Sequence, residues 1–94
     1  MAKAEIKVVL TNKMGLHARP STQIATTASR FNADVKISKD GMDVDAKSVL
    51  ELLMLAAECG SELTVEAQGD DANAAAEAVA NLVRTRFGEL DVDA

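Results

Sequence analysis

The chain has 94 residues, 48% of them hydrophobic and 27% charged, so we expect one domain over residues 1–94 with its own hydrophobic core. A net charge of −5 and only two aromatic residues argue against binding to nucleic acid through phosphates or stacked bases. The single cysteine, Cys59, excludes an internal disulfide and a cysteine-rich zinc site, and we expect it to be buried or half-buried near a helix end. No leader pattern and no run of 18 apolar residues is found, so we expect a cytoplasmic protein without a membrane span.

The charge is distributed unequally along the chain. Residues 1–47 carry eight basic and five acidic residues, a net +3, whereas residues 48–94 carry two basic and ten acidic residues, a net −8. A mildly basic half of an acidic protein favours a local site for an anion or an acidic partner, although solvated surface alone would give the same asymmetry.

The first part of the chain predicts a strand, a loop and a helix. Ile6, Val8 and Leu10 occupy alternate positions, a pattern that predicts a strand with one buried face. After a loop at residues 12–15, apolar residues spaced by four and three predict a helix: Ile24, Ala28 and Phe31. Pro20 fits only the first helical turn, so this helix should begin close to Ala18, with His17 at or next to its N-cap.

The same alternation of apolar and polar residues predicts three more strands: residues 34–38, 42–46 and 62–67. Asp40-Gly41 joins the first two of these as a hairpin, because glycine adopts positive φ without strain. A last helix should begin at residues 69–71, because carboxylates are favourable at the positive end of a helix. It should end at Gly88, and residues 89–94 should form a polar tail. Its apolar stripe contains Ala72, Ala75, Ala76, Val79, Leu82, Val83 and Phe87.

A helix between the third and fourth strands begins with a capping box. Ser48 is followed three residues later by Glu51, so that each side chain can satisfy an unpaired backbone N–H of the first turn. The helix is predicted from Val49 to about Glu58, with Gly60 as the terminator. The complete order β-α-β-β-α-β-α predicts an α+β fold, a four-stranded antiparallel sheet covered on one face by three helices.

His17 is the only histidine, and its position favours phosphoryl chemistry. The first N–H groups of a helix are unpaired and carry partial positive charge. A phosphoryl group on His17 would meet the N–H groups of Ala18 and Arg19 and the fork of donors on the Arg19 guanidinium. An imidazole is nucleophilic at neutral pH, so His17 can accept such a group and pass it on. No paired base or glycine-rich phosphate loop accompanies it, so partners would have to complete the active site.

Three segments carry a family resemblance. Residues 12–20, Asn-Lys-Met-Gly-Leu-His-Ala-Arg-Pro, resemble the active-site segment of HPr, the histidine-containing phosphocarrier family of the bacterial phosphotransferase system. Residues 46–60 resemble the regulatory-serine segment of that family, and residues 69–72 resemble the opening of its last helix. The resemblance covers roughly residues 3–89 and implies the open-faced sandwich fold of HPr.

The resemblance implies specific roles for the residues around His17. Enzyme I, charged from phosphoenolpyruvate, would transfer a phosphoryl group to Nδ1 of His17, and an EIIA domain would take it for sugar uptake. Arg19 would neutralise charge during transfer, Ala18 would contribute its backbone N–H, and Pro20 would shape the first turn, although helix capping explains Pro20 equally well. No cofactor or metal is implied, and a monomer is expected.

The resemblance also implies regulation and docking on the second helix. A dedicated ATP-dependent kinase, HPr kinase/phosphorylase, would phosphorylate Ser48 and place negative charge on the docking face, although the N-cap role alone also accounts for this serine. Enzyme I and EIIA would dock on an apolar patch close to His17. The residues expected in the patch and around its rim are Val49, Leu50, Leu53, Thr22, Gln23 and Lys47.

Three other functions are alternatives to a carrier for sugar uptake. One is an HPr-type carrier in a regulatory relay of nitrogen or carbon metabolism, which the sequence alone does not separate from sugar uptake. A second is an acyl-carrier-like module attached through Ser48, but acyl carriers are helical and their Asp-Ser-Leu motif is missing here. A third is a ferredoxin-like metal-binding domain, but one histidine and one distant cysteine give no metal-site spacing.

Overall fold

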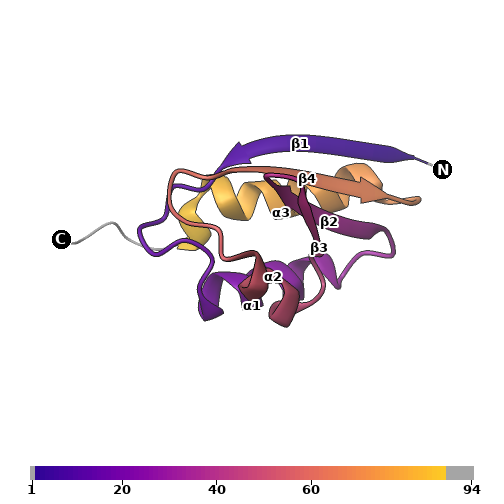
Figure 1. The fold of residues 1–94 in the computed structure, drawn as a ribbon. Coiled ribbons are helices and arrows are strands. Elements are labelled where there is room, and N and C mark those ends of the chain that lie inside the picture. Colours follow the sequence, from indigo (N-terminus) through magenta and orange to yellow (C-terminus); the bar gives the residue numbers. More distant parts are fainter. Residues whose placement is uncertain (1, 89–94) are drawn as a thin grey trace.

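The computed structural model describes residues 2–88 and shows one four-stranded sheet with three helices. The elements are β1 (Lys3–Val9), α1 (Ala18–Ala28), β2 (Asp34–Lys39), β3 (Met42–Asp45), α2 (Val49–Leu55), β4 (Glu62–Gln68), α3 (Ala72–Arg84) and the short 3-10 helix η1 (Arg86–Gly88). The strands pair antiparallel in the order β1-β4-β2-β3. All three helices lie on the same face of this sheet (Figure 1), which confirms the predicted α+β open-faced sandwich.

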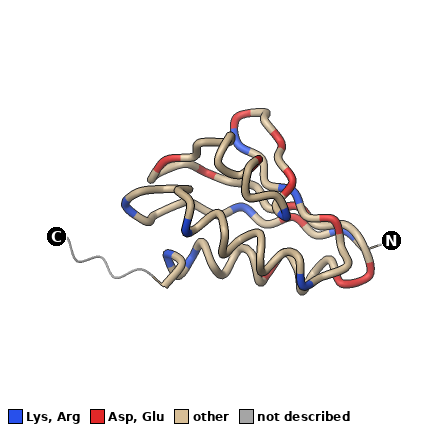
Figure 2. The backbone as a smooth tube through the Cα atoms, turned by 90° about the horizontal axis from the view of Figure 1, so that it is seen from below, with Lys and Arg blue, Asp and Glu red and all other residues tan. Residues whose placement is uncertain are grey.

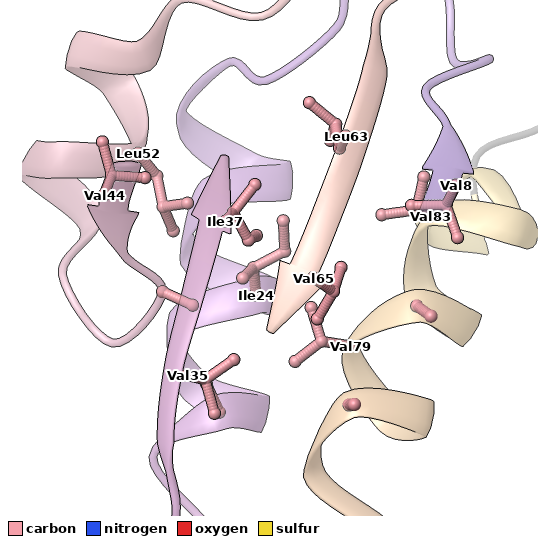
Figure 3. Close-up of a cluster of buried hydrophobic side chains, with 14 of the residues drawn as sticks. Val8, Ile24, Val35, Ile37, Val44, Leu52, Leu63, Val65, Val79 and Val83 are labelled. Atoms are coloured by element: carbon pink, nitrogen blue, oxygen red, sulfur yellow. The ribbon is translucent and has the colours of Figure 1, made fainter. Parts of the chain in front are cut away.

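The hydrophobic core lies between the sheet and the helices. Successive residues of a strand point to opposite faces, so every second side chain of β2 and β4 is buried there: Val35, Ile37, Leu63, Val65 and Ala67. Ile24 of α1, Leu52 of α2 and Val79 of α3 are fully buried against them (Figure 3). The buried face of α3 consists largely of alanine, a small side chain that lets the helix lie close to the sheet.

α2 ends three residues earlier than the sequence predicts. Ala56 adopts the left-handed conformation (φ 52°) and ends the helix, so Gly60 is not its terminator. The residues after α2 are bonded to the chain that precedes α1. The N–H of Leu16 donates to the carbonyl of Ala57 at 3.0 Å, and that of Gly60 donates to the carbonyl of Leu10 at 2.7 Å. A longer helix would break these bonds.

The other two helices also end before the aromatic residues that we assigned to them. Phe31 packs against the core from the turn after α1, and Phe87 is buried from η1, where it has a φ of 58°. In the turn after α1, the N–H groups of Asn32 and Ala33 donate to the carboxylate of Asp71 at 2.9 and 2.8 Å. Asp71 makes no capping bond to its own helix, α3, and instead holds this turn.

Candidate functional site

His17 is the N-cap residue of α1 and is exposed, which confirms its predicted place. Its backbone is extended (φ −86°, ψ −170°), and its carbonyl accepts a hydrogen bond from the N–H of Ser21 at 3.0 Å. The imidazole makes no capping hydrogen bond to the helix. Because the first N–H groups of a helix have no intrahelical acceptor, those of Ala18 and Arg19 are available to an anion carried on His17.

Gly15 shapes the turn that leads into His17. Its φ of +66° favours glycine, and a Cβ added there would lie 2.4 Å from the carbonyl oxygen of Ala57. The next residue, Leu16, donates its N–H to that same carbonyl at 3.0 Å, and the N–H of His17 donates to the carbonyl of Gly15 at 3.0 Å. The absence of a side chain at Gly15 therefore lets this loop lie close to the segment that follows α2.

The first turn of α1 is positively charged. Pro20 is buried there, at a position where its missing N–H costs the helix nothing. Arg19 is exposed and forms no ion pair with any acidic residue in the range 2–88. No Asp or Glu occurs between Glu5 and Asp34, so the charged residues of this segment are all Lys or Arg (Figure 2). This surface suits an anionic group.

Ser48 caps α2 as predicted, but the capping box is only half formed. The Ser48 Oγ accepts a hydrogen bond from the N–H of Glu51 at 3.2 Å. The Glu51 carboxylate does not return to Ser48 and instead accepts from the N–H of Asp45 at 2.9 Å. The N–H of Ser48 donates to the carbonyl of Asp45 at 3.0 Å. The half-buried Ser48 hydroxyl therefore lies at the start of α2, two residues before the exposed Leu50.

α2 presents an apolar surface to solvent beside α1, against which it packs. Leu50 is 69% exposed and Leu53 is 38% exposed, which confirms that both point outward. Met54, 63% exposed, lies on the same face and was missed, although its i+4 spacing from Leu50 would have identified it. Val49 is partly buried against the core. We call Leu50, Leu53 and Met54 the α2 patch.

The polar residues expected at the rim of this patch make local bonds. Thr22 is exposed on α1, and its Oγ1 donates to the carbonyl of Ala18 at 2.8 Å, while Gln23 is half-buried. The Nζ of Lys47 donates to the carbonyl of Phe31 at 2.9 Å. The ammonium group of Lys47 therefore also stabilises the chain just after α1.

Cys59 is exposed, so the prediction of a buried or half-buried cysteine was wrong. The error follows from the early end of α2, which leaves Cys59 in the turn before β4. Within residues 2–88, no cluster of three or more His, Cys, Asp or Glu could hold a metal ion. None of the helices in this range is long and apolar enough to cross a membrane.

Comparison with known proteins identifies the family. The model of the family described as the PTS HPr component phosphorylation site matches residues 4–85. The chain belongs to the HPr family. It is 45% identical to the phosphocarrier protein HPr of Cupriavidus necator over 80 residues, which cover 85% of this chain and 90% of that protein. It is 43% identical to the phosphocarrier protein NPr of Shewanella violacea over 89 residues, which cover 95% and 98%.

Solved HPr structures share the fold of this family member. The HPr-C-His protein of Thermoanaerobacter tengcongensis matches with a TM-score of 0.89 and 36% identity, covering 93% of this chain and 98% of that one. An HPr dimer from the same bacterium matches with a TM-score of 0.74 and 36% identity, covering 92% and 99%. That dimer counts against the monomer predicted from the sequence.

Proposed function

We propose that this HPr-family chain accepts a phosphoryl group on Nδ1 of His17 from phospho-Enzyme I and delivers it to an EIIA domain. In acceptance, the nitrogen lone pair attacks phosphorus, a P–N bond forms, and the bond between phosphorus and the donor breaks with its electron pair left on the donor. Delivery is the same exchange with His17 as the leaving group. The observation that carries the proposal is the exposed imidazole at the start of α1, beside the N–H groups of Ala18 and Arg19.

The surroundings of His17 support a carrier that uses a partner's catalytic groups. The Arg19 guanidinium is exposed and can pair with the charge of the transferred group. The α2 patch offers an apolar docking surface next to α1, and its small size suits contacts that must form and break at each transfer. Both donor and acceptor would dock on this surface in turn.

We also propose that Ser48 is a regulatory phosphorylation site for an HPr kinase/phosphorylase. A phosphate at the N-terminus of α2 is compatible with the helix dipole, so the fold would survive the modification. The added negative charge would lie two residues from Leu50, the most exposed member of the α2 patch. Phosphorylation would therefore hinder docking of acidic partners.

Intact-mass spectrometry tests the acceptor role directly. Wild-type protein incubated with phosphoenolpyruvate and Enzyme I should gain one acid-labile phosphoryl group, and His17→Ala should gain none. Ser48→Ala is the control, because it changes the other proposed phosphorylation site and should be modified like wild type. Modification of His17→Ala, or an unmodified wild type beside an HPr that the same Enzyme I does phosphorylate, would refute the proposal.

A second candidate is a regulatory relay rather than sugar uptake. It is favoured by the similarity to NPr of Shewanella violacea, which extends over 95% of this chain. The two candidates differ in the acceptor and not in the chemistry at His17. Phosphorylated protein offered a sugar-specific EIIA and a regulatory EIIA in separate reactions should transfer faster to its proper acceptor, and preference for the regulatory domain would support the relay.

A further inference from the structure

Asn12 is a buried polar residue in a loop whose neighbouring residues are exposed. It is 1% exposed, whereas Thr11, Lys13 and Met14 are all open to solvent. A buried amide is costly unless it is hydrogen-bonded. The Nδ2 of Asn12 donates to the carbonyl of Gly15 at 2.8 Å, and the N–H of Gly15 donates to the carbonyl of Asn12 at 3.2 Å. These two bonds run in opposite directions and close the turn before His17.

The Gly15 carbonyl connects this turn to His17. It accepts both the Nδ2 of Asn12 at 2.8 Å and the backbone N–H of His17 at 3.0 Å. A single oxygen atom therefore joins a buried side chain to the backbone of the phosphoryl acceptor. On its other side, the turn is held by the bond from the Leu16 N–H to the Ala57 carbonyl.

Packing alone does not account for an asparagine at this position. Its second amide atom, Oδ1, is buried and has no hydrogen-bond partner among the residues described. An unpaired buried acceptor destabilises a fold, and a leucine of similar shape would leave no acceptor unpaired. The property that leucine lacks is the N–H donor that holds the Gly15 carbonyl.

We propose that Asn12 is a positioning residue for phosphoryl transfer at His17. The amide of Asn12 holds the Gly15 carbonyl, which in turn binds the His17 N–H. It thereby fixes the position of the His17 backbone relative to the free N–H groups at the start of α1. A phosphoryl group needs the imidazole and these donors together, since small misplacements of reacting groups slow a reaction strongly. This inference rests on the proposed role of His17.

The test compares Asn12→Leu with Ser21→Ala. Ser21 is the matched control, because it is also fully buried and its Oγ has no hydrogen-bond partner within residues 2–88, yet its side chain is not bonded to Gly15. Two donors are used: phospho-Enzyme I, which must dock, and phosphoramidate, a small donor that does not. Asn12→Leu should lower kcat with Enzyme I by about tenfold or more at unchanged KM, and should slow phosphoramidate similarly. Ser21→Ala should retain wild-type rates with both donors.

The outcomes separate this inference from the proposed function. A wild-type kcat in Asn12→Leu, a raised KM alone, or a defect confined to Enzyme I would each overturn the positioning role. If circular dichroism shows that Asn12→Leu does not fold, Asn12→Ala takes its place, since it removes the amide without adding apolar bulk. A wild-type protein that accepts no phosphoryl group on His17 from either donor would instead refute the proposed function itself.

Discussion

Replacing Gly15 with alanine should destabilise the protein and displace His17. At a φ of +66° an added Cβ costs about 1 kcal/mol. That Cβ would lie 2.4 Å from the Ala57 carbonyl oxygen and 3.0 Å from the Cα of Glu58, both of them backbone atoms. The loop must therefore move away, and loss of the Leu16–Ala57 hydrogen bond adds about 1 kcal/mol. With the displaced loop included, the free energy of unfolding should fall by about 2–4 kcal/mol.

Gly41→Ala is the matched control, because it isolates the backbone contribution. Gly41 also has a positive φ, +84°, in the turn between β2 and β3, but in the described part of the chain no atom lies within 4 Å of an added Cβ. Alanine there meets the conformational penalty alone, which is partly offset because alanine restricts the unfolded chain. We expect a loss of about 1 kcal/mol or less at Gly41.

Urea denaturation followed by circular dichroism gives both free energies, and the Enzyme I assay gives the rates. Gly15→Ala should slow phosphoryl acceptance by about tenfold or more, because it disturbs the backbone of His17, while Gly41→Ala should react like wild type. Equal losses of stability in the two variants would refute the reasoning, because the contact with Ala57 would then impose no constraint on the loop.

Three further predictions concern α2 and the turn after α1. Leu50→Ala should raise the KM for Enzyme I without changing stability. Leu52→Ala should lower the free energy of unfolding by about 2–5 kcal/mol, because Leu52 is fully buried. Equal stabilities of the two variants in urea denaturation would contradict this. Ser48→Asp keeps an N-cap residue, so it should slow phosphoryl acceptance at unchanged Tm, and an unchanged rate would argue against charge at the docking surface. Backbone N–H donors, chiefly that of Asn32, lower the pKa of Asp71 in the folded protein. The ionised carboxylate therefore stabilises the fold at pH values above the pKa of Asp71 in the unfolded chain. This contribution is lost as the pH falls through the lower pKa of Asp71 in the folded protein. Asp71→Asn should therefore flatten the fall of Tm below about pH 4, and an unchanged fall would disprove this role.

The strands and their order along the chain were predictable because the sequence patterns that determine them are local. Val35 and Ile37 are buried on alternate positions of β2, and Asp40-Gly41 adopts positive φ at both residues of the hairpin. Helix ends were not predictable in the same way, because tertiary contacts determine them. Ala56 ends α2 without a glycine, and only the pairing of the following residues with the loop before α1 explains why.

In the candidate site, too, the residues determined by local sequence were predictable, and those determined by tertiary contacts were not. His17, Arg19 and Pro20 are contiguous, and the helix start that organises them depends on near neighbours in sequence. Asn12 has no local pattern that marks it as buried, since an asparagine in a loop is ordinarily exposed. Its burial and its bond to Gly15 follow from the way the loop packs against the chain after α2, which no local pattern reveals.

As the proposed nucleophile, His17 meets two partners from an exposed position and therefore needs a fixed backbone to orient it during transfer. The turn before His17 can supply this constraint, because two hydrogen bonds join Asn12 to Gly15 and Gly15 packs closely against the Ala57 carbonyl. The α2 patch, in contrast, projects from a helix whose buried face is separately anchored in the core by Leu52. Substitutions in the turn should therefore change the chemical step, whereas those in the patch should change partner binding, so kcat and KM should respond to different sets of residues.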